Sequence, residues 1–329
     1  MFKGLKRRLN GSKKYDSSTE SSDNPANLPH LQELERMTPS PNWHGFEQDD
    51  IWQNKLPPDI ILYIMDEFLQ DQESTITAFS STCRCMYTLC LSRRFNRVTI
   101  NTRNRDSPTS IERFARMVAK RPQILSFTQR LVLLDQGFMF QGSRPITVEE
   151  ECLCYILTRC AQYANLRRID LSFRVVWNLL PLPVKKACLD IFSMPSLKHI
   201  SFDYMAIPAN VLYVLSGIST FEMKGEVRPF SSNELPLPIT KSCTTRCTPK
   251  KVVLWDKSRT GFIMTNLLDS QTGLCLNDLE EVVILASSQH LTLLEGFLES
   301  CGTSLRHMEL HSPRGEYELL RYTPLERIC

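Results

Sequence analysis

The sequence lacks the short motifs that mark the common catalytic sites. It has no Gly-rich phosphate loop, no Gly-x-Ser-x-Gly elbow and no His-Glu-x-x-His helix. The six histidines are scattered along the chain instead of being grouped. These absences predict a protein that is not an enzyme.

Long apolar runs and a strong net charge are also missing. No apolar run approaches the roughly 18 residues that a membrane-spanning helix needs, and no secretory apolar region follows the charged start. The net charge of +3 is too small to indicate nucleic acid as the main partner. We therefore expect a cytoplasmic or nuclear protein with no stable membrane insertion and no nucleic-acid partner.

Cysteine is present, but not in an arrangement typical of disulfides or zinc. Many of the twelve cysteines fall in helix-like patterns, such as Cys152, Cys154 and Cys160, where a small buried side chain is the usual role. The pair most like metal ligands, Cys243-x-x-x-Cys247, lacks a second Cys or His pair at zinc-finger spacing. We expect no metal, no cofactor and a reducing compartment.

Residues 1–50 have little apolar surface to bury, which predicts a disordered tail. Lysine and arginine dominate the first 14 residues, which contain no acidic residue, and a Ser/Thr cluster follows. The basic start is compatible with a nuclear-import patch, a weak contact with an anionic membrane or a solvated tail. The sequence leaves these three open.

Two amphipathic helical runs follow between Leu56 and Leu89. The prolines at 57 and 58 suit the first turn of a helix, where the backbone N–H has no intrahelical partner. The apolar residues recur at helical spacing, first at Ile60, Ile61, Ile64, Phe68 and Leu69, and then at Ile76, Phe79, Cys83, Met86 and Tyr87. About 40 residues cannot bury this much apolar surface alone, so part of it is expected to contact a partner.

This stretch resembles an F-box of the fungal type. The resemblance rests on Leu56-Pro57, Asp59, Ile60-Ile61, Ile64, Phe68-Leu69, Phe79-Ser80 and Thr82-Cys83-Arg84, and the family's frequent closing Leu-Trp is replaced here by Arg94-Phe95. It implies docking on the Skp-type adaptor of a cullin-RING ubiquitin ligase through Leu56, Pro57, Ile60, Ile61, Ile64, Phe79 and Cys83. The alternative is an ordinary helical hairpin inside a larger core.

From Phe95 onward one frame recurs, with apolar residues at its first, fourth and sixth places. The full copies begin at Phe95, Leu166, Leu197, Ile218, Leu279 and Leu305, and partial copies occur at Leu131-x-Leu133, Val252-x-Leu254 and Leu325-x-x-Ile328. Helices are expected between the copies, after Pro108, after Thr147 with its capping box to Glu150, after Pro208 and after Ser288. Short strands that alternate with helices indicate a coiled βα array.

This frame resembles a degenerate leucine-rich repeat. The copies that begin at 166, 197 and 218 are 31 and 21 residues apart, so the period is irregular. The predicted fold class is α/β, with a small all-helical F-box module at 51–95 followed by an irregular leucine-rich-repeat-like βα solenoid at 96–329. A doubly wound α/β domain is the alternative.

Side chains alternate across a strand, so the third, fifth and seventh places of each frame should face away from the helices. In leucine-rich solenoids that face is the concave binding wall. The predicted substrate-binding residues are Arg168, Asp170, His199, Asp203, Glu222, Lys224, Val253, Trp255, Leu285, His307 and Glu309. Trp255 is expected to anchor a protein substrate, unless the proline-rich segment 229–249 folds over the wall and buries it.

Two functions remain open at this stage. The chain is either the substrate-recognition subunit of an SCF-type ligase, with the Skp-type adaptor, the cullin scaffold and an unknown protein substrate as partners, or an interaction scaffold with no ligase role. In the first case Ile60, Ile61 and Ile64 should be partly exposed in the isolated chain. In the second they should be buried against the first repeats.

Overall fold

The computed structural model describes residues 60, 63, 73–82, 84–101, 110–135, 147–173, 177–215, 217–228, 247–255, 264, 265, 267, 274–285, 291–301, 304–311 and 320–322. The expected tail at 1–50, most of the proline-rich segment 229–249 and the final frame at 325–328 lie outside these residues, as do Leu56, Pro57, Ile61, Ile64 and Cys83.

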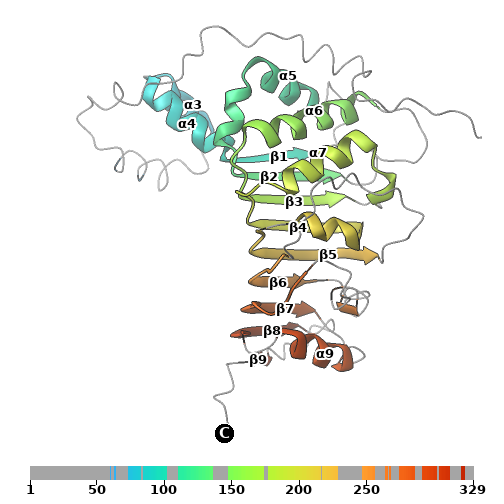
Figure 1. Ribbon diagram of the computed structural model, residues 1–329. Helices are drawn as coiled ribbons and strands as arrows, with labels where there is room; N and C mark the ends of the chain where they lie inside the picture. Colours follow the sequence, from blue (N-terminus) through green and yellow to red (C-terminus); the bar gives the residue numbers. More distant parts are fainter. Residues whose placement is uncertain are drawn as a thin grey trace, which may run out of the picture.

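One sheet organises the described part of the chain (Figure 1). Its strands lie side by side in chain order, and the first eight pair in parallel while the last is antiparallel to its neighbour. They are β1 (Arg97–Asn101), β2 (Arg130–Asp135), β3 (Arg168–Phe173), β4 (His199–Pro208), β5 (Thr220–Arg228), β6 (Lys251–Leu254), β7 (Glu281–Leu285), β8 (His307–His311) and β9 (Leu320–Tyr322).

Helices occupy many of the connections between these strands. The α-helices are α3 (Glu73–Ser80), α4 (Arg84–Asn96), α5 (Ser110–Lys120), α6 (Val148–Tyr163), α7 (Leu182–Phe192) and α9 (Leu291–Cys301), and 3₁₀ turns occur at η3 (Pro122–Phe127), η4 (Trp177–Leu179) and η5 (Ala209–Val214). Helices α3 and α4 lie beside the β1 end of the sheet, and α9 lies near β8 (Figure 1). The fold is α/β, and its interleaved parallel order is consistent with the leucine-rich-repeat-like arrangement expected from the sequence.

The recurring frame predicts strands β1 to β8 correctly. In β3 the fourth and sixth places, Ile169 and Leu171, are fully buried, whereas Arg168, Asp170 and Ser172 are half-buried. The same alternation places Ile200 and Phe202 of β4 in one continuous core with the apolar faces of the helices. The first, fourth and sixth places of each copy thus face the core, and its third, fifth and seventh places form the opposite face of the sheet.

The capping box predicted at the start of α6 is present. Thr147 accepts a hydrogen bond from the backbone N–H of Glu150, and the Glu150 side chain accepts one from the backbone N–H of Thr147. Two donors that the first turn would otherwise leave unpaired are therefore satisfied.

The prediction of an α-helix after Pro208 is wrong. Strand β4 continues to Pro208, and the residues that follow form only the 3₁₀ turn η5. The connection from Pro208 to β5 at Thr220 is short, and a 3₁₀ turn rises about 2.0 Å per residue, so it spans distance with fewer residues than an α-helix. Strand β4 also has a register shift between Asp203 and Ala206, where Tyr204 has a φ of 58°.

Aromatic side chains fill the centre of the core. Trp177 packs against Phe192 with ring centroids 6.1 Å apart, Phe192 against Phe202 at 5.8 Å, and Phe202 against Phe221 at 6.2 Å. The row runs from η4 through α7 to the adjacent strands β4 and β5. These contacts fix the two strands that carry the middle of the polar face described next.

Candidate functional site

The candidate site is the sheet face that points away from the core, called here the wall and defined as the third, fifth and seventh places of the frame on β1 to β8. Parallel pairing without shifts over these places aligns them into rows. Arg168 pairs with His199 and His199 with Thr220 in the third-place row, and Asp170 pairs with Ser201 and Ser201 with Glu222 in the fifth-place row. The predicted wall residues on the middle strands therefore lie together.

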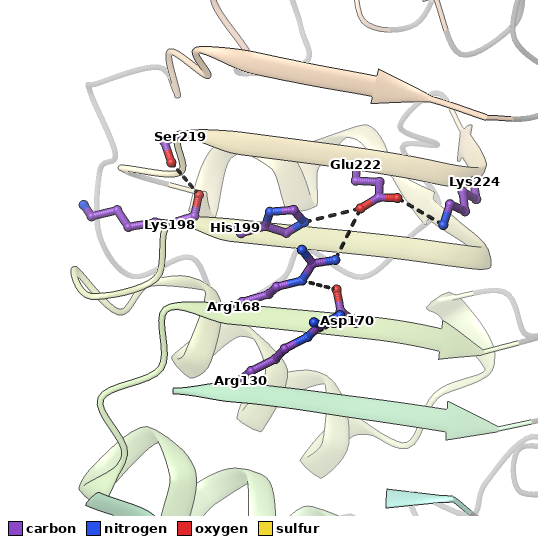
Figure 2. A network of polar contacts seen from close by, with 8 residues as sticks. All are labelled: Arg130, Arg168, Asp170, Lys198, His199, Ser219, Glu222 and Lys224. Atoms are coloured by element: carbon purple, nitrogen blue, oxygen red, sulfur yellow. Dashed lines mark hydrogen bonds and ion pairs between the residues drawn. The ribbon is translucent and has the colours of Figure 1, made fainter. Parts of the chain in front are cut away.

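Asp170 is the first centre of an ion-pair network on the wall (Figure 2). Its carboxylate accepts from Arg130 of β2 at 2.7 Å and from Arg168 of β3 at 2.8 Å. One carboxylate thus neutralises the charges of two guanidinium groups, which would repel each other if left unpaired.

Glu222 of β5 is the second centre. Its carboxylate lies 3.3 Å from Nε2 of His199 and 3.0 Å from Nζ of Lys224, and Nη2 of Arg168 is 3.6 Å away (Figure 2). The hydrogen bond from His199, together with the hydrogen bond from Lys224 and its charge, lowers the pKa of Glu222 to about 2. Burial of the carboxyl group acts in the opposite direction.

The network crosses strand β4, although the fifth place of β4 carries no charged side chain. Arg168 on β3 reaches Glu222 on β5, and between them in the row stands Ser201 of β4, which is buried. A serine is small enough to lie beneath the ion pairs. The polar half of the wall is therefore built in advance from internal contacts, including a hydrogen bond of 3.1 Å from Ser172 Oγ to Asp203.

The other half of the wall, on β6 to β8, is more apolar. Val253, Val283 and Leu285 are buried although they lie on the face opposite the helices. Trp255 follows β6, is 37% exposed, and stacks on His311 of β8 with ring centroids 4.9 Å apart. Because Leu285 of β7 pairs with His311 in this row, the two rings meet across the β7 strand.

A histidine pair flanks this apolar half. His307 Nε2 lies 3.1 Å from Glu309 and His311 Nε2 lies 3.5 Å from the same carboxylate. The hydrogen bond from His307, with the weaker contact from His311, lowers the pKa of Glu309 below its ordinary value. Trp255, His311, His307 and Glu309 thus form one contiguous group at the β8 end of the wall.

The structure brings the predicted substrate residues into two groups and leaves the predicted adaptor residues elsewhere. Arg168, Asp170, His199, Glu222 and Lys224 join the ion-pair network, with Asp203 beside them. The second group comprises Val253, Trp255, Leu285, His307 and Glu309. Trp255 is 37% exposed, and most of the proline-rich segment that could cover it lies outside the described residues.

The predicted adaptor residues that the structure describes lie in the helical region before β1. Ile60 is helical and 46% exposed, and Tyr63 one turn later is 61% exposed. Phe79 is half-buried and packs with Ile76 and Met86 around Cys90, in an apolar cluster separate from the main core. The helical region therefore has its own small centre of packing.

Sequence reasoning missed Arg130 of the wall and Tyr204, which directly follows the wall residue Asp203. Arg130 occupies the third place of the partial copy on β2, so extending the frame to that copy would have found it. Tyr204 is 60% exposed at the register shift of β4, and no pattern in the sequence marks that shift. An exposed aromatic side chain of this kind is common in protein interfaces.

The described cysteines behave as packing side chains. Burial raises the pKa of Cys160, Cys188 and Cys301 to about 12, so these thiols stay protonated at neutral pH. Cys247, from the pair most like metal ligands, is also buried with a pKa raised to about 12. Within the described residues no group of three or more His, Cys, Asp or Glu could hold a metal ion.

The fold places this chain in the α/β class, and it is built on one sheet whose first eight strands are parallel. Comparison with protein-family models, with curated proteins and with solved structures finds no match. In the part of the chain that the structure describes, no helix is both long and apolar enough to cross a membrane.

Proposed function

We propose that this chain is the substrate-recognition subunit of an SCF-type cullin-RING ubiquitin ligase. The helical region at 51–95 docks on the Skp-type adaptor, and the wall of the repeat domain at 96–329 holds a protein substrate. Transfer of ubiquitin then depends on proximity, because a tethered target meets the charged ubiquitin carrier at a high effective concentration. No residue of this chain needs to act as nucleophile or base.

The exposure of Ile60 carries this proposal. An isoleucine that is 46% exposed on a helix, followed one turn later by the more exposed Tyr63, leaves apolar surface uncovered in the isolated chain. The F-box resemblance assigns Ile60 to the adaptor interface. A purely structural hairpin that caps the repeats would instead bury this side chain, because apolar burial is what stabilises such a cap.

The adaptor interface is tested by Ile60→Asp. A charged side chain at an apolar anchor is expected to weaken binding of a recombinant Skp-type adaptor at least about thirtyfold, equivalent to about 2 kcal/mol. Isothermal titration calorimetry on the full chain measures this change. The matched control is Leu182→Asp on α7, where a 50% exposed leucine lies outside the helical region and the adaptor affinity should not change.

If the wild-type chain shows no affinity for any Skp-type adaptor, the ligase role is refuted and the scaffold function takes its place. The same follows if Ile60→Asp and Leu182→Asp bind the adaptor equally well.

The substrate surface is tested by Trp255→Ala. We expect the variant to lose the proteins that the wild type brings into adaptor-dependent ubiquitylation, while its adaptor affinity stays unchanged. The loss of the stack on His311 should lower the free energy of unfolding by only about 0.5–1.5 kcal/mol. Quantitative mass spectrometry of ubiquitylated proteins, paired with thermal denaturation, measures both effects.

The reciprocal variant separates the two surfaces. Ile60→Asp should lose the adaptor but keep the proteins captured by the wall. A Trp255→Ala variant that is markedly destabilised yet retains every captured protein would show that Trp255 serves folding and not binding.

A further inference from the structure

A cavity of about 690 Å³ lies between the helical region and the first repeat, away from the wall. Helices α3 and α4 form one side, and α5 with η3 forms the other. The volume lies in the range of about 300–1,000 Å³ that is typical of binding pockets. Neither the F-box resemblance nor the wall accounts for it.

Apolar side chains from both sides line the interior of this cavity. Ile76 of α3 and Leu91 of α4 face Met117 of α5 and Ile124 of η3 across it. Leu91 and Ile124 are buried, and Ile76 and Met117 are half-buried. A buried interior with partly exposed apolar side chains suits one or two apolar anchors of a ligand.

Cations line the same cavity on the α5 side. Arg113, Arg116 and Lys120 occur at i, i+3 and i+7, so they lie along one face of α5 over about 10 Å. Arg121 and Arg94 add two further cations, and among the described lining residues none is acidic. The rim is thus strongly positive although the chain as a whole carries a net charge of only +3.

Arg121 and Arg116 make contacts that orient their guanidinium groups. Arg121 Nη1 donates to Tyr87 Oη at 3.1 Å, which joins the α5 side to α4, and Arg116 lies 4.0 Å from Glu112. A guanidinium carries five N–H donors, so one contact does not exhaust it. Further guanidinium N–H donors of Arg116 and Arg121 therefore remain at the cavity rim beside these contacts.

We propose that this cavity binds an acidic amphipathic segment of a partner protein. One or two apolar side chains of the segment enter between Leu91 and Met117, and its carboxylates pair with Arg113, Arg116 and Lys120 along α5. The charge pattern favours a polypeptide over a single anionic headgroup. A headgroup presents its charge at one point, whereas these three cations follow a helix face and match carboxylates spaced along a chain.

The test uses the full-length chain and a short fluorescein-labelled peptide with leucine and glutamate at helical spacing. Fluorescence anisotropy should show that this peptide binds at least about tenfold more tightly than a version with glutamine for glutamate or serine for leucine. Raised ionic strength should weaken the binding. The double variant R116E plus K120E should weaken it at least about tenfold, because two attractive pairs become repulsive.

The control is R159E plus K186E, which reverses two cations on α6 and α7 outside the cavity and should change the affinity less than about twofold. Three results would overturn the proposal. The first is equal affinity for the leucine and serine peptides, and the second is an equal loss of peptide affinity in the two double variants. The third is that the peptide does not bind at all, while the chain binds phosphatidylserine vesicles in a way that depends on Arg116 and Lys120. The last result would assign the cavity to a lipid.

Discussion

Replacing Phe202 with alanine is expected to lower the free energy of unfolding by about 3–5 kcal/mol. Phe202 is fully buried on β4, and its ring lies 5.8 Å from that of Phe192 and 6.2 Å from that of Phe221. Removal of the ring breaks the aromatic row at its middle and leaves a cavity that two strands and a helix cannot easily close. Urea denaturation followed by circular dichroism measures the change.

The matched control is Tyr163→Ala at the end of α6. Tyr163 is 44% exposed, so its truncation should change the free energy of unfolding by less than about 1 kcal/mol. A cost for Phe202→Ala no larger than that for Tyr163→Ala would mean that β4 does not sit in the core as described. Because β4 also carries His199 and Asp203, such a result would remove the basis for the polar half of the wall.

Stability is also expected to fall in acid because of Glu222. Its pKa is about 2 in the folded protein against an ordinary value of 4.5, so the unfolded chain binds the proton more readily. The resulting stabilisation, up to about 3 kcal/mol, is fully present above about pH 4.5 and is lost as the pH falls toward 2. Glu222→Gln should lose this stabilisation at neutral pH and show a flatter acid limb.

Urea denaturation at several pH values measures this effect. The control is Glu280→Gln, which removes an exposed carboxylate paired with Lys250 at 2.8 Å. Solvent screens that pair, so the acid limb should stay close to that of the wild type. An acid limb of Glu222→Gln that overlays the wild type would contradict the role given to His199 and Lys224.

The sequence was sufficient to predict strands β1 to β8 and the composition of the wall, because both depend on local alternation. Ile169 and Leu171 are buried and Arg168 and Asp170 are not, as a two-residue period requires. The helix expected after Pro208 failed because its pattern of apolar residues also fits a shorter 3₁₀ turn. Only the distance to β5 decides between the two.

The contacts within the site could not be predicted in this way. That Arg168 reaches over Ser201 to Glu222, or that Trp255 meets His311 across β7, depends on side-chain conformations and on neighbours two strands away. The cavity beside α5 is still less accessible to sequence reasoning. Its walls come from four separate elements, and no local pattern shows that Ile76 and Met117 face the same space.

The reversed direction of β9 bears on how this sheet could change in length. A duplicated strand-and-helix unit inserted between β3 and β4 would meet parallel partners on both sides, as the existing strands do. A unit added beside β9 in the direction of the other strands would pair with it antiparallel, unlike the units within the array. Gain or loss of units in evolution is therefore expected inside the array, where it would alter the spacing between the ion-pair network and Trp255.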